Sequence, residues 1–482
     1  MQHKTKRSSG ARQAASLYAA SFPADPGARY KKQMQSAADK QDAGLSTVAD
    51  ASRQRSFYLE TYGCQMNLAD SELIQGVLKN AGYRPVADPL DAGVVLLNTC
   101  AIREHAEQRV AQRVRALISA SRNSRVRIGL AGCMAQHHRE KLLATIPGLD
   151  FVVGPDGYRG LGELLNAEGG FAQLRLDRDE TYADISPVRG EGTRAWLTIM
   201  RGCNRFCTFC VVPYVRGRER SLPAPVLLNE LRSIAEQGYK EVVLLGQTVN
   251  AYDHDGVDFA ALLRMASSVD GIERVRFTSP HPADMSARDI EAMADCDKVM
   301  PQLHLPLQSG SDSVLKAMDR GHDMEQYMRL VEQVRASVDD VALSTDIIVG
   351  FPGESESDFE ATSAVMDEVG FDHAYMFKYS RRERTRAEDI EETVSEEEKS
   401  ARLSRLIDEQ QERARSINER MLGQLTQVLA ESPAKKQAGW LAGKNPQYKT
   451  VVFDPHGAAV GELVNVKIEA TGPQTLRGER VV

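Results

Sequence analysis

The chain has 482 residues, of which 26% are charged and 42% hydrophobic, and its formal net charge is −7. This length predicts two to four domains with at least one sizeable core. The absence of any run of eighteen apolar residues excludes a membrane-spanning helix, and the acidic balance excludes a protein that binds nucleic acid through bulk charge. The seven cysteines lack the spacing of a disulfide framework and indicate reduced, metal-binding thiols.

The first part of the chain, residues 1–55, contains ten Lys and Arg and four Asp and has no sustained apolar period. This composition predicts a disordered extension. Asp25 is the only acidic residue among the first 38, so a mitochondrial transit peptide is an alternative interpretation. A cytoplasmic protein with a simple extension is the favoured one.

From residue 56 a short apolar strand, a cysteine and a helical stretch recur three times. The strands are predicted at 57–61, 94–99 and 127–132, and the cysteines that follow them are Cys64, Cys100 and Cys133. One βα unit separates successive cysteines, which predicts a parallel α/β sheet with the three thiols at adjacent strand ends. Burial of the three as core thiols is the alternative. Three cysteines in register favour a metal cluster.

A linker is expected at residues 166–190, and a strand at 195–200 then leads into Cys203, Cys207 and Cys210. Three closely spaced thiolates hold three irons of a [4Fe-4S] cluster and leave the fourth iron open to a ligand, whereas four would close a zinc site. A zinc knuckle is the weaker alternative. Cys296 lies outside both sets and is interpreted as a core thiol.

Further strands alternate with helical patterns and predict a partial (β/α)6 barrel with its functional loops at the strand C-termini. These strands are expected at 241–245, 274–278, 302–307, 342–349 and 374–379. The loops that follow them carry small or polar residues suited to a cofactor pocket, although ordinary turns use the same residues. The candidate cofactor-binding residues are Gly246, Gln247, Asn250, Gln308, Ser309, Gly310, Gly350 and Glu354.

Ser395 and Glu398 have the spacing of a capping box that begins a long charged helix through about Met421. Four alternating segments follow, at 426–431, 439–442, 448–453 and 463–468, and predict a small antiparallel β-barrel. Basic residues on this barrel and beside the cysteine loop are candidates for phosphate contacts, with a solvated surface as the alternative. The four selected are Arg216, Arg218, Lys444 and Lys449.

Five motifs together resemble the radical-SAM (S-adenosylmethionine) methylthiotransferases, from about Phe57 to the C-terminus. They are Thr61-Tyr62-Gly63-Cys64-Gln65-Met66-Asn67, residues 201–217, Leu245-Gly246-Gln247-Thr248-Val249-Asn250, residues 303–312 and residues 346–354. Within this family the chain is most similar to the branch that acts on isopentenyladenosine in transfer RNA (tRNA). The implied domains are a methylthiotransferase domain at 56–168, a radical-SAM core at 189–419 and a TRAM RNA-binding domain at 420–482.

The resemblance implies methylthiolation at C2 of N6-isopentenyladenosine at tRNA position 37. It assigns a SAM-cleaving [4Fe-4S] cluster to Cys203, Cys207 and Cys210 and an auxiliary [4Fe-4S] cluster to Cys64, Cys100 and Cys133. No side chain is expected to be the catalytic group, because cluster sulfur and SAM carry such chemistry. The implied partners are tRNA already isopentenylated at adenosine 37 and a low-potential flavodoxin- or ferredoxin-like electron donor; the sulfur source is not implied, and a monomer is expected.

The sequence departs from the family pattern after the last barrel strand, where Arg382-Glu383-Arg384 replaces the usual Pro-Gly turn. This departure leaves the substrate-facing geometry there open. Three other functions remain as alternatives: modification of threonylcarbamoyladenosine in tRNA, modification of an aspartate of a ribosomal protein, and a non-enzymatic iron-sulfur sensor that binds RNA.

Overall fold

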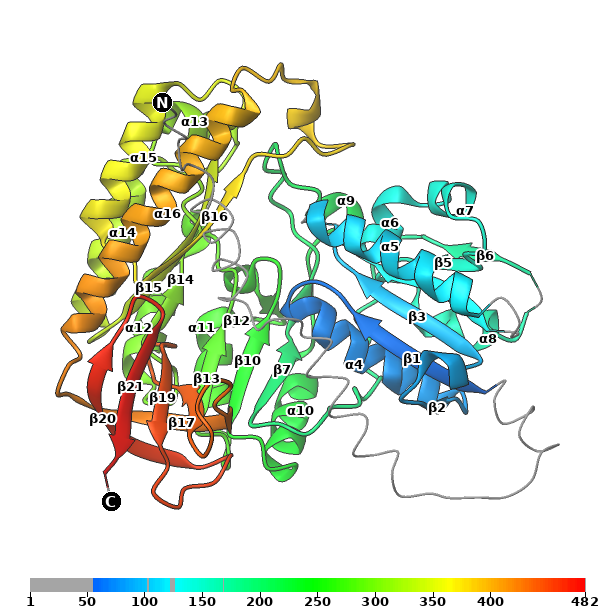
Figure 1. The fold of residues 1–482 in the computed structure, drawn as a ribbon, viewed down its shortest axis with the longest axis horizontal. Helices are drawn as coiled ribbons and strands as arrows, with labels where there is room; N and C mark the ends of the chain where they lie inside the picture. The colour runs from blue at the N-terminus through cyan, green and yellow to red at the C-terminus, as the bar shows by residue number, and fades with distance from the viewer. Residues whose placement is uncertain (1–54, 102–103, 122–125, 168, 482) are drawn as a thin grey trace, which may run out of the picture. The chain divides into compact units, whose positions relative to one another are not determined.

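The computed structural model describes residues 55–101, 104–121, 126–167 and 169–481 (Figure 1). Contacts divide the chain into two compact units: an N-terminal unit of Met1–Val153 with Tyr158–Leu174, and a C-terminal unit of Gly154–Gly157 with Arg175–Val482. The predicted extension and its transit-peptide alternative fall almost entirely outside the described residues. Within those residues, no helix has the length and apolar character needed to cross a membrane.

The N-terminal unit is built on a six-stranded parallel sheet in the order β2-β1-β3-β4-β5-β6, which confirms the predicted parallel α/β fold. Its strands are β1 (Ser56–Thr61), β2 (Arg84–Pro85), β3 (Val94–Thr99), β4 (Arg127–Gly132), β5 (Phe151–Val153) and β6 (Phe171–Gln173). The helices are α4 (Gln65–Asn80), α5 (Glu104–Ala120), α6 (Cys133–His138), α7 (Lys141–Thr145) and α8 (Leu161–Leu164). Every residue of β1 and β3 is buried, as helices on both faces of a parallel sheet require.

The two outer strands of this sheet, β2 and β6, are absent from the sequence prediction. β6 lies within the expected linker at 166–190, where it pairs in parallel with β5 through Phe151 and Phe171. The rings of these two residues stack with centroids 4.8 Å apart. The sheet therefore extends beyond residue 168, where the first domain was predicted to end. The domain boundaries 56–168, 189–419 and 420–482 stay predictions from sequence.

The C-terminal unit contains the six predicted parallel strands as two three-stranded sheets, β13-β10-β7 and β14-β15-β16. The strands are β7 (Arg194–Thr198), β10 (Glu241–Leu245), β13 (Arg274–Phe277), β14 (Gln302–His304), β15 (Ala342–Val349) and β16 (His373–Lys378). A single parallel bridge, Val275 to Val299, links β13 to the segment before β14. β14 is shorter than predicted, because Pro306 has no backbone N–H to continue the ladder.

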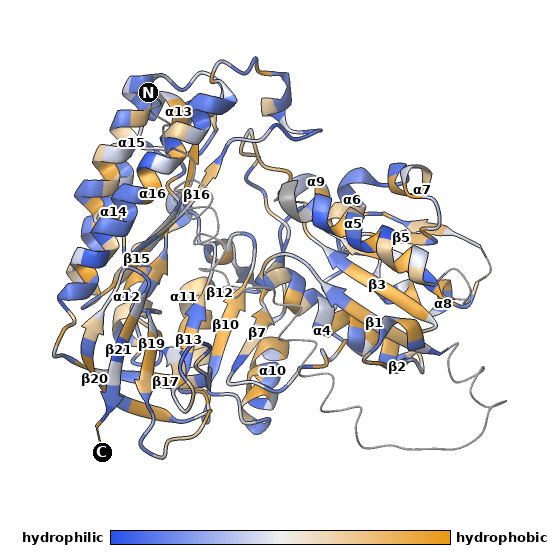
Figure 2. Cartoon of the chain, in the orientation of Figure 1, coloured by the Kyte–Doolittle hydropathy of each residue, from blue (hydrophilic) through white to orange (hydrophobic). Residues whose placement is uncertain are grey.

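The helices of this unit follow the predicted alternation with the strands. They are α9 (Val212–Arg216), α10 (Ala224–Glu236), α11 (Phe259–Ser267), α12 (Ala287–Asp295), α13 (Asp312–Ala317), α14 (Met324–Ser337) and α15 (Glu356–Val369). Figure 2 shows apolar residues concentrated on the strands and polar residues along the helices. The long charged helix is α16 (Glu396–Glu419). Its predicted capping box is confirmed in one half: the Ser395 hydroxyl accepts a hydrogen bond from the Glu398 N–H at 3.2 Å, whereas the Glu398 carboxylate pairs with Arg402 and does not return a bond to Ser395.

The chain ends in a closed five-stranded barrel in the order β17-β18-β19-β21-β20. The strands are β17 (Leu425–Pro433), β18 (Leu441–Lys444), β19 (Thr450–Asp454), β20 (Leu463–Thr471) and β21 (Thr475–Arg480). The barrel was predicted, but β21 was not, because its sequence TLRGER shows little apolar alternation. β19 and β21 pair in parallel, so the prediction of an entirely antiparallel barrel was wrong.

Buried charges join this barrel to the starts of β7, β10 and β13. The Arg274 guanidinium donates to the Lys444 carbonyl at 2.7 Å, and that of Arg276 donates to the Asn445 carbonyl at 2.8 Å. Glu241 is fully buried and forms ion pairs with both Arg194 and Arg276. Because such charges are costly to bury singly, their pairing fixes the barrel at the N-terminal ends of the strands.

Candidate functional site

The cysteine loop of the C-terminal unit lies between two short antiparallel strands, β8 (Met200–Arg201) and β9 (Arg220–Ser221), which pair with each other. Gly202 has a φ of +79°, and a Cβ at this position would lie 1.9 Å from the Arg218 carbonyl oxygen. Only glycine fits this conformation and this close approach. The Cys203 N–H then donates to the Gly217 carbonyl at 3.1 Å, so that the loop begins in a fixed orientation.

The three thiols of this loop lie in a setting that suits iron-bound thiolates. Cys203 and Cys207 are buried and Cys210 is partly exposed. Burial, followed by the nearby Cys207 thiol, raises the pKa of Cys210 to about 12, and burial also raises the pKa of Cys203. The free thiols of Cys203 and Cys210 therefore stay protonated at neutral pH, and iron would have to displace their protons on binding.

Hydrogen bonds converge on these sulfurs. The Cys203 Sγ lies 3.2 Å from the Thr248 hydroxyl and accepts from the Arg205 N–H at 3.3 Å. The Arg320 guanidinium donates to the Cys207 Sγ at 3.3 Å. Donors of this kind are typical neighbours of cluster-ligating cysteines, because they stabilise sulfur that carries negative charge.

The three cysteines of the N-terminal unit lie just beyond neighbouring strand ends, as predicted. Thr61 pairs with Asn98 and Thr99 pairs with Gly132, so β1, β3 and β4 end side by side. A Cβ on Gly63 would lie 2.7 Å from the Cys100 Cβ, which places the loop of Cys64 directly against Cys100. Cys100 and Cys133 each follow the last residue of their strand.

A buried amide network that sequence reasoning missed holds these loops together. The Asn67 Nδ2 donates to the Asn98 Oδ1 at 3.2 Å and to the Thr99 carbonyl at 3.1 Å. The Asn98 Nδ2 donates in return to the Asn67 carbonyl at 2.8 Å and to the Ser71 hydroxyl at 3.0 Å. The Cys64 thiol donates to the Asn67 Oδ1 at 3.3 Å, which connects the network to a candidate ligand.

Several buried polar atoms beside the loop of Cys203, Cys207 and Cys210 have no hydrogen-bond partner among the residues that the structure describes. They are the Gln247 Nε2, the His281 Nε2, the His322 Nε2 and the Arg320 Nε. Burial and the positive charge of Arg320 lower the pKa of His281 to about 2 and that of His322 to about 4, so both imidazoles are neutral at pH 7. Unpartnered buried donors and acceptors are what a polar ligand would satisfy.

Both cysteine sets therefore fit iron-sulfur clusters, judged by their donor atoms and by the glycines that make room for them. Among the described residues, no three His, Cys, Asp or Glu side chains are grouped as ligands of one metal ion. The fit thus rests on the sulfur donors, the hydrogen bonds to them and the close approach at Gly63 and Gly202.

Comparison with known proteins decides the family. Residues 197–365 match the Radical SAM superfamily, and residues 56–154 match the uncharacterized protein family UPF0004. The chain is 43% identical over 433 residues to the tRNA-2-methylthio-N(6)-dimethylallyladenosine synthase of Chlorobium luteolum, a match that covers 88% of this chain and 97% of that protein. The chain belongs to this synthase family.

A second relative supports the assignment, and the solved structures agree on the fold. The synthase of Clostridium perfringens is 40% identical over 445 residues, covering 90% of this chain and all of that protein. The radical SAM methyltransferase TsrM of Kitasatospora setae, with cobalamin and a [4Fe-4S] cluster bound, has a TM-score of 0.54 at 13% identity, covering 69% of this chain and 74% of that one. The predicted family is confirmed.

Most of the predicted cofactor-binding residues of this synthase-family chain hold its loops in place. Asn250 pins the loop of His281 through two hydrogen bonds of 3.0 and 2.8 Å to its carbonyl and N–H. Ser309 is fully buried against the Thr362 hydroxyl, which also accepts from the Gly310 N–H at 2.9 Å. The two neighbouring residues therefore position their loop on α15.

The two remaining loops behave differently. The Glu354 carboxylate accepts from the Gly350 N–H at 2.6 Å and pairs with Arg402 at 2.7 Å, so it closes its own loop. Gln308 is buried with a φ of +75° and bonds to β15 through its backbone. Gln247, which follows Gly246, accepts from the Gly202 N–H at 2.5 Å and keeps its Nε2 unpartnered; it is the predicted residue best placed for a ligand.

The predicted RNA contacts divide into one exposed and three enclosed side chains. Arg218 is exposed and lies over the Phe206 ring at 4.4 Å, whereas Arg216 is only 3% exposed. Lys449 forms an ion pair with Asp372 at 2.5 Å. Lys444 is partly buried, donates to the Thr450 hydroxyl at 2.8 Å and lies 4.5 Å from the centre of the Tyr448 ring. These three side chains are buried or engaged by protein groups in this conformation, and their contact with RNA stays a prediction.

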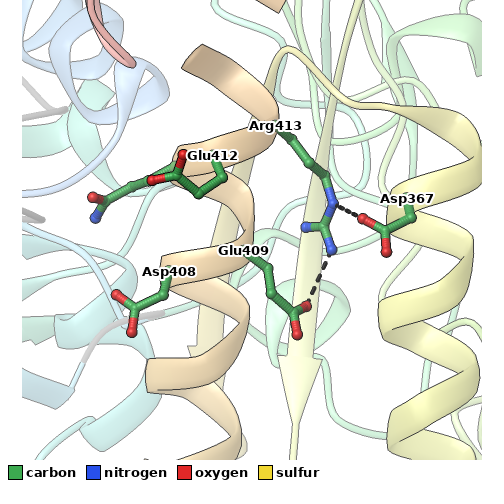
Figure 3. A pocket seen from close by; sticks show the side chains of 6 residues that line it. Asp367, Asp408, Glu409, Glu412 and Arg413 are labelled. Carbon is green, nitrogen blue, oxygen red and sulfur yellow. Dashed lines mark hydrogen bonds and ion pairs between the residues drawn. The ribbon is translucent and has the colours of Figure 1, made fainter. Parts of the chain in front are cut away.

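Two other features lie outside the candidate site. Cys296 is partly exposed at the C-cap of α12, so its interpretation as a core thiol is not supported. A hollow of about 560 Å³ between α15 and α16 is lined by Asp367, Asp408, Glu409, Gln411, Glu412 and Arg413. Figure 3 shows Arg413 bridging Asp367 and Glu409, which makes this hollow an ion-paired surface without a cysteine.

Proposed function

We propose that the chain catalyses methylthiolation at C2 of N6-isopentenyladenosine at tRNA position 37. SAM is the methyl donor and also the radical source. The observation that carries the proposal is the presence of two separate sets of three cysteines, one in the radical SAM region and one at three neighbouring strand ends. The names of relatives more than 40% identical supply the substrate.

The residues that would hold the cofactors follow from the site. Cys203, Cys207 and Cys210 would hold a [4Fe-4S] cluster with one open iron for SAM, and Cys64, Cys100 and Cys133 would hold an auxiliary [4Fe-4S] cluster. When bound, these groups supply one-electron cleavage of SAM and the sulfur and methyl that are transferred. The enzyme class and cofactors predicted from sequence agree with family membership.

The chain's own residues contribute orientation and shielding. Gln247 and the neutral imidazoles of His281 and His322 offer unpartnered polar atoms that would orient the amino acid and nucleoside groups of SAM. Burial of Cys203 and Cys207 keeps water away from the reacting centre, which limits side reactions. The Asn67–Asn98 network holds the auxiliary cysteines in register.

For the RNA, we propose that the C-terminal barrel is a TRAM module and that Arg218 contacts the anticodon loop beside the cysteine loop. A single-stranded loop exposes its bases, so no base has to be extracted from a duplex. A basic side chain over an aromatic ring suits backbone and base contacts together. A flavodoxin- or ferredoxin-like electron donor, a monomeric state and a cytoplasmic location complete the proposal.

The deciding experiment is nucleoside analysis of tRNA treated with reconstituted protein, SAM and dithionite. We expect 2-methylthio-N6-isopentenyladenosine from isopentenylated tRNA, and no product from unmodified tRNA, threonylcarbamoylated tRNA or ribosomal protein. A methylthiolated product from threonylcarbamoylated tRNA or from ribosomal protein would show that this molecule, and not isopentenylated tRNA, is the substrate. SAM cleavage without any methylthio product, or no cleavage at all, would contradict the proposed reaction.

Cysteine variants assign the two sites separately. Cys203→Ala is expected to abolish both SAM cleavage and product formation, whereas Cys100→Ala is expected to abolish the product and retain SAM cleavage. Cys296→Ala is the matched control, because this cysteine belongs to neither set. Equal effects of Cys100→Ala and Cys296→Ala would contradict the proposed auxiliary site.

A further inference from the structure

The turn that ends α13 fixes the backbone of Arg320. The Asp319 N–H donates to the Lys316 carbonyl and the Arg320 N–H donates to the Leu315 carbonyl, both at 3.1 Å. Asp319 has a φ of +56°. These are the paired bonds of a Schellman motif, in which the residue after the left-handed position has a defined direction. Arg320 therefore leaves the helix in one orientation.

The same segment is tied to the cysteine loop. Thr208, which lies between Cys207 and Cys210, donates from its N–H to the Met318 carbonyl and from its hydroxyl to the Ala317 carbonyl, each at 2.9 Å. Two bonds from one residue to two successive carbonyls leave little freedom between the segments. The position of Arg320 relative to the cysteines is thus set by the backbone of both.

The Arg320 guanidinium is a buried cation without a carboxylate partner. Its residue is 5% exposed, and no Asp or Glu among the described residues forms an ion pair with it. The Nη1 donates to the Cys207 Sγ at 3.3 Å and the Nη2 donates to the Pro306 carbonyl at 3.0 Å, whereas the Nε has no partner in the described part of the chain. An unpaired buried charge is costly, and the Cys207 sulfur that it contacts would supply negative charge beside it once this thiol is bound to iron as a thiolate.

We propose that Arg320 is a positioning residue that raises the reduction potential of the cluster held by Cys203, Cys207 and Cys210. Reduction adds one electron from an external low-potential donor and breaks no bond. A fixed cation that donates a hydrogen bond to a ligand sulfur stabilises the more negative, reduced state. The inference rests on a cluster at this loop, which the proposed function includes, and it does not depend on which RNA is modified.

The test measures the potential directly. In full-length protein whose other cluster is removed by Cys64→Ala, Cys100→Ala and Cys133→Ala, the reduced fraction is followed by electron paramagnetic resonance during redox titration. We expect Arg320→Met to lower the ratio of reduced to oxidised cluster about tenfold at a given potential, which corresponds to about 59 mV for one electron. Arg320→Lys keeps the positive charge but loses the planar guanidinium, so its reduction potential is expected to lie between those of the parent protein and Arg320→Met.

Controls separate this role from a purely structural one. Arg329→Met makes the same chemical change at an exposed position of α14 and is expected to leave the potential unchanged. Iron content and the unfolding temperature are measured for each variant. If Arg320→Met retains its iron and its potential equals that of Arg329→Met, the proposal is overturned.

A variant that fails to load iron is also informative. In that case Arg320→Gln, which keeps an N–H donor without the charge, is titrated, and a lowered potential supports the proposal. Loss of iron from the Met, Gln and Lys variants alike, at an unchanged unfolding temperature, would assign Arg320 to cluster retention and would overturn the proposed effect on potential. Failure to modify tRNA in the parent protein would leave this result standing, which keeps the two hypotheses distinguishable.

Discussion

At the scale of single residues, Gly202 shows how a backbone position limits the chemistry around it. Gly202→Ala combines an unfavourable positive φ with a Cβ 1.9 Å from the Arg218 carbonyl. The strain alone costs about 1–2 kcal/mol, and the contact forces the cysteine loop to move. We expect iron content at this loop to fall several-fold, measured by iron assay in the absence of the auxiliary cysteines.

Gly238→Ala is the matched control for this variant. Gly238 has a φ of +87°, but a Cβ there would meet no atom within 4 Å. It should show the loss of stability without the loss of iron. Equal iron content in the two variants would show that the close approach at Gly202 is not needed for cluster binding.

Lys444 provides a second test, through pH. Burial lowers the pKa of Lys444 from 10.5 to about 8, against the opposing effect of Glu431. Between pH 8 and 10.5 the unfolded chain binds more protons at this lysine than the folded chain does, so its contribution to stability rises with pH. At pH 7 the buried charge destabilises the fold.

Lys444→Met is therefore expected to stabilise the protein at pH 7 by about 1–2 kcal/mol, after allowance for partial exposure and the lost contact with Tyr448. Thermal unfolding at pH 7 and pH 10 measures the effect, which should shrink at the higher pH. Lys467→Met, at an exposed position of β20, is the control. A destabilised Lys444→Met with weaker tRNA binding would instead support an RNA contact at this lysine.

At the scale of elements, the fold is predictable from sequence where the signal is local. Apolar runs locate the main strands, and their spacing places Cys64, Cys100 and Cys133 at neighbouring ends. β6 escapes prediction because three residues are too few to show an apolar period, and β21 escapes it because its sequence is mostly polar. The Asn67–Asn98 pair escapes because it joins residues 31 positions apart, and nothing in either residue's own neighbourhood indicates the partner. The burial of Arg216 and the ion pair of Lys449 could not be predicted either, because both depend on how distant segments pack in the fold.

The loops at the ends of β1, β3 and β4 act together through Asn98. Asn98→Ala removes the two hydrogen bonds between the Asn67 and Asn98 groups in a buried site, at about 0.5–1.5 kcal/mol for each bond, although the Asn67 Nδ2 keeps the Thr99 carbonyl as acceptor. We expect a lower unfolding temperature and loss of about half of the bound iron, because only one of two [4Fe-4S] sites is affected. Asn229→Ala, on the exposed side of α10, should keep the unfolding temperature and the iron content of the parent protein. Retention of all iron by Asn98→Ala would contradict a shared role of the network and the cysteines.

At the scale of the whole C-terminal unit, Glu241 decides how firmly the barrel is held. Burial would raise its pKa, but Arg194 and Arg276 together lower it from 4.5 to about 2. The carboxylate therefore stabilises the fold fully above pH 4.5, and this contribution is lost as the pH falls toward 2. Glu241→Gln is expected to cost about 3–5 kcal/mol at pH 7, because two buried guanidinium groups lose a partner.

Hydrogen exchange followed by mass spectrometry checks this expectation. Peptides from β17 to β21 should exchange faster in Glu241→Gln than in the parent protein, and the variant's stability should fall less between pH 4.5 and pH 2. Glu325→Gln, which breaks the exposed pair with Arg329, should change stability by less than about 1 kcal/mol. Unaltered exchange in the barrel of Glu241→Gln would show that other contacts suffice to hold it.

The attachment of the barrel through Glu241 also determines how far the barrel lies from the cysteine loop. Glu241 begins β10 at the barrel, and Gln247, just beyond the other end of this strand, bonds to Gly202 of the cysteine loop. Six residues of extended chain span about 20 Å. The barrel and the cysteine loop therefore lie at opposite ends of one strand, so the buried ion pairs of Glu241 also fix the distance between the barrel and the candidate cluster site.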